Sequence, residues 1–244
     1  MRTTAHSACR DCAQSGFGGP GENRFTAYDA LCRGDLCRSA GFPQVFVNSS
    51  NLTLYVRVTD LVYGALPPAF SLDRSYNQDD THVGPFGTGW SFNLGDSLAA
   101  DPDGSQVLRR GSGRIDRFAP AVASGSGSGF FAVTATTDTL VRNGDGTFTL
   151  RSAGSATTRI FRADGRMVAI QDSGATRVSM DYDNAGRLTA AHYRGRVLQF
   201  SYDSGGRITS VSDSAGRKVS YSYTSDGQAR RLTAKKVKKK MRLK

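Results

Sequence analysis

A motif that recurs about every twenty residues constrains the fold of this chain more than any other feature. Three heads of the form aromatic-x-x-x-Gly-Arg-aliphatic follow one another: FRADGRM at 161–167, YDNAGRL at 182–188 and YDSGGRI at 202–208. A degenerate fourth head, YTSDGQ, begins at Tyr223. A second series of glycines at 174, 195 and 216 has the same period, so each unit contains two turns and therefore two strands.

The residues of one unit show why the units must associate. In YDSGGR, Asp203 can accept hydrogen bonds from nearby main-chain amides, and Gly206 tolerates a positive φ, so the chain can reverse tightly. The aromatic residue before the turn and the aliphatic residue after it lie on one face, and Arg207 can reach an aspartate across the turn. A single hairpin cannot bury such an apolar face, so neighbouring hairpins must pair side by side. We predict an all-β fold in which antiparallel β-hairpin repeats form a curled sheet.

Composition supports the same fold class. The chain has 28 glycines, Glu22 is its only glutamate, and Lys218 is its only lysine before residue 229, so good helix formers are scarce. The net charge of +11 is concentrated in residues 229–244, which carry nine positive charges and no negative one. The rest of the chain has 32 − 9 = 23 basic against 21 acidic residues, so we expect no specific nucleic-acid binding. We expect the basic tail to be disordered; a basic arm that binds nucleic acid or anionic lipid weakly is the alternative.

Changes in composition and in the hydrophobic pattern along the chain suggest four segments. We expect an irregular cysteine-containing segment at 1–43, an entry module of alternating strands at 44–130, hairpin repeats at 131–228 and the tail at 229–244. In the entry module, SQVLRR is expected to pair with GRIDRF across an Asp-Gly turn in DPDGS. Trp90, the one tryptophan, is expected to be a buried anchor. No apolar run is long enough to cross a bilayer.

The four cysteines leave three alternatives open. Their spacing, Cys9-x2-Cys12 and Cys32-x4-Cys37, suits two disulfides and also suits a tetrahedral zinc site, and unpaired thiols are the third possibility. Disulfides are the first choice and zinc the second. Gly16-x-Gly18-x-x-Gly21 has the spacing of a dinucleotide motif but lacks the preceding strand and following helix that such a site needs, so we predict no cofactor.

Catalytic residues are hard to find in this sequence, and we predict that the chain is not an enzyme. Its three histidines are His6, His82 and His192. The best candidate site is Asp79-Asp80-Thr81-His82, which could bind a metal or activate water, although a solvated loop is the simpler interpretation. A single glutamate excludes a pair of glutamates for glycoside cleavage.

Two motifs in a fixed order carry a family resemblance. The heads YDNAGRL and YDSGGRI match the YD repeat, Tyr-Asp-x-x-Gly-Arg-aliphatic. The run from VNSSNLTLYVRVTDLVY to GPFGTGWSFNLGDSL resembles the entry module that precedes the repeats in many Rhs-type proteins. The residues that define the clearest repeats are Tyr182, Asp183, Gly186, Arg187, Tyr202, Asp203, Gly206 and Arg207.

The resemblance implies a role as a container. Repeats of this family wind into a hollow β-shell around a variable C-terminal polypeptide, often a toxin used between bacteria, whereas other members are adhesive or carbohydrate-binding surface proteins. We therefore expect a truncated, non-enzymatic fragment of a secreted or cell-surface Rhs/YD-repeat protein. The expected partners are its own enclosed polypeptide, a secretion apparatus or surface glycans. A surface carbohydrate-binding protein and a cryptic hydrolase are the alternatives.

Overall fold

The computed structural model describes residues 25–28, 43–48, 51–63, 70–121, 128–134, 136–152, 155–172, 175–225, 227 and 229–235. Within these residues every regular element is a β-strand, arranged in two sheets and one small hairpin. The all-β prediction is therefore confirmed. None of the described elements is a helix that could span a bilayer.

The smaller sheet, here called the N-terminal sheet, has five antiparallel strands in the order β1-β2-β3-β4-β7. Its strands are β1 (Phe25–Tyr28), β2 (Gln44–Asn48), β3 (Leu54–Tyr63), β4 (Phe70–Asn77) and β7 (Trp90–Phe92). Between β4 and β7 the chain makes a small hairpin of β5 (Val83–Gly84) and β6 (Gly87–Thr88), here called the Pro85 hairpin. In the β3–β4 ladder Thr59 pairs with Asp73 and Leu61 with Leu72, so Asp60 is the extra residue of a bulge.

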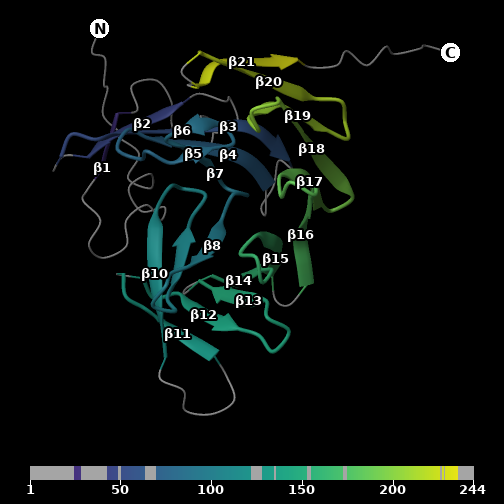
Figure 1. The fold of residues 1–244 in the computed structure, drawn as a ribbon. Helices are drawn as coiled ribbons and strands as arrows, with labels where there is room; N and C mark the ends of the chain where they lie inside the picture. Colours follow the sequence, from purple (N-terminus) through teal and green to yellow (C-terminus); the bar gives the residue numbers. More distant parts are fainter. Residues whose placement is uncertain are drawn as a thin grey trace, which may run out of the picture.

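The larger sheet, here called the long sheet, has fourteen strands in strictly sequential order, each antiparallel to the next. Its strands are β8 (Ser97–Ala100), β9 (Gln106–Arg109), β10 (Ile115–Pro120), β11 (Ser128–Ala132), β12 (Thr139–Arg142), β13 (Phe148–Arg151), β14 (Thr157–Phe161), β15 (Met167–Asp172), β16 (Ala175–Tyr182), β17 (Leu188–Tyr193), β18 (Arg196–Tyr202), β19 (Ile208–Asp213), β20 (Lys218–Tyr223) and β21 (Ala229–Lys235). Its two outer strands, β8 and β21, do not pair with each other, so the sheet is open. Figure 1 shows it curling from β8 and β10 through β12 and β16 to β21.

One turn geometry recurs along the long sheet. In the Asp183 turn, the Asp183 amide donates to the Arg187 carbonyl and the Gly186 amide to the Asp183 carbonyl. The same pair of bonds closes the turns that begin at residues 101, 110, 143, 162, 203 and 213. The fourth residue of each is a glycine with φ between 77° and 85°, a conformation that suits glycine far better than other residues. The turn chemistry of the repeats thus begins well before the first repeat head.

Strand β8, at one edge of the long sheet, is bound by a turn of the same sheet. The Leu98 amide of β8 donates to the Gly165 carbonyl at 2.8 Å, and Ser97 forms an isolated bridge with Arg166. A side chain at Gly165 would collide with the Leu98 carbonyl oxygen. The outer strand of the sheet is therefore covered by the turn between β14 and β15.

Side chains of the chain itself fill the inside of the curl. Large apolar residues from β9 to β15 are fully buried there: Leu108, Phe118, Leu140, Leu150, Phe161 and Met167. The N-terminal sheet and the segments that follow it add further members of the same core: Leu72, Phe86, Phe92 and Leu94. Figure 1 shows this sheet lying against the inner side of β17–β20. The core is continuous from one sheet to the other.

Several sequence-based boundaries differ from the structure. Residues 25–28, inside the segment expected to be irregular, form β1, which pairs with β2. The change of sheet falls between Phe92 and Ser97, whereas residue 130 lies within β11 of the long sheet. Residues 229–235 were expected to be disordered, and that expectation is wrong because they pair with β20 as β21. An outer strand needs only one hydrogen-bonded neighbour, so its charge did not exclude it from the sheet.

The expected pairing of SQVLRR with GRIDRF is correct, but its turn was misplaced. β9 pairs with β10 through the turn at residues 110–114, and the DPDGS turn joins β8 to β9 instead. Two adjacent turns of the same glycine type made the assignment ambiguous from sequence.

Candidate functional site

The Asp–Arg pair of each YD head closes its own turn. Asp183 Oδ1 accepts the Arg187 amide at 2.8 Å, and its Oδ2 accepts Arg187 Nε at 2.7 Å. Asp203 and Arg207 repeat this arrangement at 2.9 Å and 2.8 Å. The predicted reach of Arg207 across the turn is confirmed. The carboxylate thus satisfies one main-chain donor and one guanidinium donor of the same residue.

The tyrosine of each head binds the preceding repeat. The Tyr182 hydroxyl donates to the Met167 carbonyl at 2.6 Å, and the Tyr202 hydroxyl donates to the Leu188 carbonyl at 2.7 Å. Tyr223 continues the series with the Ile208 carbonyl at 2.6 Å. Each accepting residue is the buried aliphatic position that follows Gly-Arg in the preceding head. These bonds fix the lateral register of one hairpin on the next.

A bulge accompanies every head. Tyr202 pairs with Ile208, whereas its neighbour Ser201 pairs with Ser210, so one residue is left over. The same shift occurs at Phe161, Tyr182 and Tyr223. The aromatic residue and the aliphatic residue are direct partners, which places them on one face as predicted.

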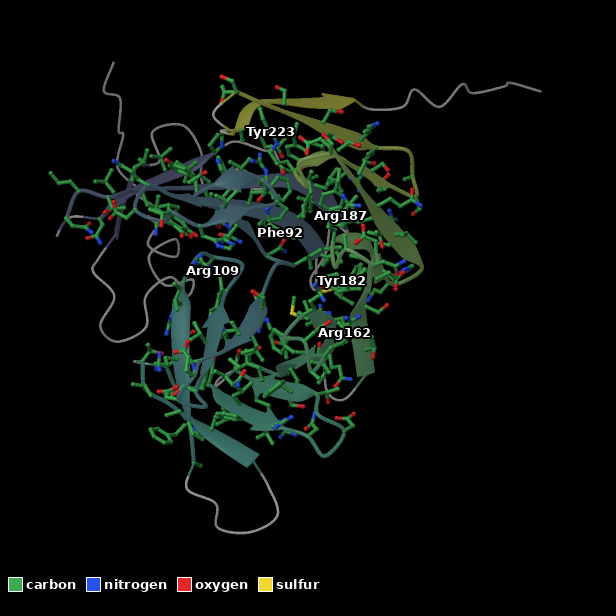
Figure 2. All side chains as sticks on the ribbon, in the orientation of Figure 1. Phe92, Arg109, Arg162, Tyr182, Arg187 and Tyr223 are labelled. Carbon is green, nitrogen blue, oxygen red and sulfur yellow. The ribbon has the colours of Figure 1, made fainter. Side chains whose placement is uncertain are left out.

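The arginine of a head also contacts the following repeat. The Arg187 guanidinium lies 5.1 Å from the centroid of the Tyr202 ring, and that of Arg207 lies 4.8 Å from the Tyr223 ring. Such cation–π contacts are worth about 0.5–1 kcal/mol at exposed sites. Figure 2 shows Arg162, Tyr182, Arg187 and Tyr223 one after another along the curled sheet. Aspartate, arginine and tyrosine together therefore link successive repeats.

Electrostatics keep these turn residues in fixed protonation states. Hydrogen bonds from the Arg187 and Arg207 amides lower the pKa of Asp183 and Asp203, respectively. In the first head, FRADGRM, the hydrogen bond from Arg162 lowers the pKa of Asp164 to about 2. Burial raises the pKa of Tyr182 to about 12. At neutral pH the carboxylates are charged acceptors and the phenols are neutral donors, as their bonds require.

A third complete Asp-x-x-Gly-Arg turn, which does not belong to any of the predicted heads, lies on the opposite rim of the sheet. Asp213 Oδ1 accepts the Arg217 amide at 2.7 Å and Oδ2 accepts Arg217 Nε at 2.5 Å. The residue before Asp213 is a serine, so a search for Tyr-Asp passes over it. Its sequence, DSAGR at 213–217, fits the Asp-x-x-Gly-Arg pattern of the heads and is the signal by which the turn can be recognised. Arg217 reaches the N-terminal sheet, where its Nη1 donates to the Val62 carbonyl at 2.9 Å.

The N-terminal sheet is held against β20 by a buried charge pair. Arg74 donates to the Asp60 carboxylate from Nε at 2.5 Å and from Nη2 at 3.0 Å. The Tyr221 hydroxyl donates to the same carboxylate at 2.7 Å. The Arg74 guanidinium also lies 4.6 Å from the Trp90 ring and 5.0 Å from the Tyr221 ring. A buried charge needs such partners, and the bulge at Asp60 supplies the carboxylate.

The Pro85 hairpin projects into the core beside the last repeats. The Ile208 amide donates to the Pro85 carbonyl at 2.8 Å. Phe86 is fully buried, with ring centroids 5.0 Å from Tyr221 and 5.3 Å from Phe92. A side chain at Gly87 would collide with the Gly227 carbonyl oxygen.

A second aromatic contact joins the N-terminal sheet to the long sheet. Phe70 of β4 stacks on Tyr193 of β17, with ring centroids 4.8 Å apart. In Figure 2, Phe92 lies between the two sheets.

The carboxylates of Asp79 and Asp80, in the candidate loop at 79–82, bind other parts of the fold. Asp80 Oδ2 is bound by Arg109 at 2.7 Å, and Asp79 accepts the Thr53 hydroxyl, so both carboxylates are engaged in holding the loop. His82 is mostly exposed, and the partial burial of its ring, with the nearby charge of Arg109, lowers its pKa. Among the described residues no three His, Cys, Asp or Glu side chains converge as a metal site would require.

The other residues singled out by sequence have varied outcomes. His192 pairs with Asp181 on the surface at 2.7 Å. Trp90 is partly buried and packs on the core, in keeping with a structural anchor. His6, Cys9, Cys12, Cys32 and Cys37 lie outside the described residues, as does the Gly16–Gly21 motif. The choice between disulfides and zinc therefore stays a prediction.

Two family models match separate parts of the chain. Residues 50–118 match a domain of unknown function, DUF6531, and residues 150–241 match the teneurin YD shell. The comparison with curated proteins gave no match. The two matched regions occur in the order that the resemblance implied, and the second contains the Tyr, Asp and Arg contacts described above. The chain therefore contains a DUF6531 module followed by a region that matches the YD shell of the teneurin-type YD-repeat family.

Proposed function

We propose that this chain is a non-enzymatic structural part of a secreted bacterial YD-repeat protein, whose β-shell encloses or displays a polypeptide such as a C-terminal toxin. The observation that carries the proposal is the use of the motif residues. Hydrogen bonds within and between repeats engage the polar groups of Tyr202, Asp203 and Arg207. Side chains so engaged stabilise a wall and are not available for chemistry on a substrate. YD-shell repeats are typically structural and not catalytic.

The filled interior supports the proposal that this segment lies at one end of a shell. The concave face of β17–β20 is covered by the N-terminal sheet and the Pro85 hairpin, through Phe70, Phe86 and Phe92. A polypeptide held by the shell would therefore not contact these strands. In our proposal this segment forms a closed end, and strands added beyond β21 surround the enclosed polypeptide.

Limited proteolysis of the complete gene product, produced with an epitope at its C-terminus, tests the proposal. We expect the C-terminal polypeptide to resist cleavage in the intact protein and to be cleaved rapidly when Tyr202→Ala weakens the wall. Equal cleavage of the C-terminal polypeptide in the intact protein and in isolation would overturn enclosure. Fractionation of the producing cells, followed by detection of the epitope, tests secretion.

Two further measurements separate the alternatives. Binding to a glycan array that is lost on substitution of exposed repeat residues, without loss of folding, would favour a carbohydrate-binding surface protein. Hydrolytic turnover that disappears in His82→Ala would favour a hydrolase.

A further inference from the structure

The same five-residue turn is used for two different contacts in this chain. In the turns at Asp183 and Asp203, the arginine stacks on the tyrosine of the next repeat. In the turn at Asp213, the arginine donates instead to the Val62 carbonyl of β3, 155 residues earlier in the sequence. The Asp–Arg geometry within the turn is the same in all three cases. Only the contact made outside the turn differs.

The position of the Asp213 turn distinguishes it from its equivalents on the same rim. Gly216 belongs to the glycine series 174, 195 and 216. At the turn one period earlier, His192 and Arg196 stand where Asp213 and Arg217 stand here, and β17 and β18 are joined by the two residues Arg194 and Gly195. The first position of that turn is therefore a histidine, whereas the turn at 213–217 begins with an aspartate.

We propose that the Asp213–Arg217 turn, together with Tyr221, is the docking site that positions the N-terminal sheet on the long sheet. It selects the β19–β20 hairpin from among the repeat hairpins, and Arg217 is its positioning residue. This inference rests on the contacts between the two sheets and does not depend on whether the shell encloses a polypeptide.

Three features make Arg217 suited to this role. Asp213 has a fully buried side chain and is bound by the Arg217 amide and Nε and by the Ala215 amide, so the guanidinium is held in one orientation. Burial disfavours the charged carboxylate, but its bonds with Arg217 outweigh this and lower the pKa of Asp213. The acceptor is a main-chain carbonyl near the end of β3, and a planar guanidinium can bind it with one nitrogen while another holds Asp213.

Tyr221 completes the docking site on the next strand. It lies four residues after Arg217, and its hydroxyl binds Asp60, the bulged residue of β3. Arg217 and Tyr221 thus bind two points of one strand of the N-terminal sheet, Val62 and Asp60.

A hairpin shifted by one repeat would present different side chains to the N-terminal sheet. His192, Arg196 and Phe200 would replace Asp213, Arg217 and Tyr221. Phe200 has no hydroxyl for Asp60, so that register would leave a buried carboxylate short of a donor.

Hydrogen exchange on the intact chain tests the proposal, with Arg217→Ala compared with the matched variant Arg207→Ala. Both variants remove the arginine of a complete Asp-x-x-Gly-Arg turn. We expect Arg217→Ala to speed exchange of the amides at Leu61 and Val62 about fivefold, which corresponds to the loss of one net hydrogen bond. Arg207→Ala should leave these amides unchanged and speed exchange in β20 instead.

The outcomes distinguish a docking site from a general effect on stability. Equal acceleration of β3 exchange by both variants, or no acceleration by Arg217→Ala, would overturn the proposal. If Arg217→Ala does not fold, Tyr221→Phe gives the second reading. Removal of its hydroxyl should speed exchange around Asp60 with β16 and β17 unaffected, and unchanged exchange at Asp60 would also overturn the proposal.

Discussion

The phenol of Tyr202 and the main-chain carbonyl of Leu188 join two successive repeats by a hydrogen bond of 2.7 Å. Tyr202→Phe removes this bond and leaves the ring in place. We expect it to lower the free energy of unfolding by about 1 kcal/mol, the usual net value of one hydrogen bond. Urea unfolding followed by circular dichroism measures the change. Gln199→Ala, an exposed position of the same strand, should stay within about 0.5 kcal/mol of the parent, and an equal loss in both variants would contradict the assignment.

Two glycines with the same backbone conformation should respond differently to alanine. Gly165 and Gly195 have φ of 82° and 73°. At Gly195 no atom lies close to an added Cβ, so Gly195→Ala should cost only the backbone strain of about 1–2 kcal/mol. At Gly165 the added Cβ meets the Leu98 carbonyl, so the loss should be clearly larger and should include the Leu98–Gly165 bond. Thermal unfolding of the two variants compares them, and similar costs would show that β8 is not held by this turn.

Arg194 offers a stabilising substitution. It occupies the first position of the two-residue turn between β17 and β18 with φ of 47°, followed by Gly195. Asparagine is favoured at this position of a hairpin turn, because it tolerates a positive φ better than arginine does. We expect Arg194→Asn to raise the free energy of unfolding by about 0.5–1 kcal/mol. A fall in the urea midpoint would mean that the Arg194 contact with the Tyr193 ring outweighs the backbone strain.

Phe86 should be the most sensitive position of the Pro85 hairpin. Its ring is fully buried between Phe92 and Tyr221. We expect Phe86→Ala to cost about 3–5 kcal/mol, as is usual for a large core side chain. Phe131 is 55% exposed on β11, so Phe131→Ala is the matched control and should change stability little. The two urea midpoints give the comparison, and comparable losses would contradict the observed burial.

The aspartates of the repeat turns should make the fold sensitive to acid. The pKa of Asp164 is lowered to about 2, chiefly by Arg162, and those of Asp183 and Asp203 are lowered from the ordinary 3.8. Because these groups hold protons less tightly when folded, the unfolded chain takes up protons first as the pH falls. Stability should therefore be complete above about pH 4 and fall towards pH 2. Urea midpoints from pH 6 to pH 2 measure this, and Asp183→Asn/Asp203→Asn should flatten the profile.

Local patterns predicted the parts of the site that lie within one repeat. The spacing of Tyr202, Gly206 and Ile208 was enough to place the aromatic and aliphatic residues opposite each other, and Asp203 before Arg207 was enough to predict their pairing. The destination of the Tyr202 hydroxyl was not predictable, because it depends on a bulge and on the register between hairpins. Neither the bulge nor the register can be recognised from the sequence of a single repeat.

Contacts between distant segments were also beyond the sequence patterns. Asp60 is an ordinary strand residue by pattern, and only the bulge in β3 makes it the partner of Arg74 and Tyr221. Arg217 was hidden because its turn lacks the tyrosine that defines the repeat. The strand at 229–235 was missed because composition describes side chains, whereas an outer strand is decided by the main-chain donors and acceptors of its neighbour.

The seal between Leu98 and Gly165 gives the long sheet a direction. Since the amide of Leu98 is already bonded to a turn within the same sheet, an incoming strand cannot add fully alongside β8. A further strand can therefore pair more fully past β21 than past β8, as in a polymer with one blocked and one growing terminus. A ribosome delivers the chain in that same direction, so each hairpin can join a finished border as it emerges.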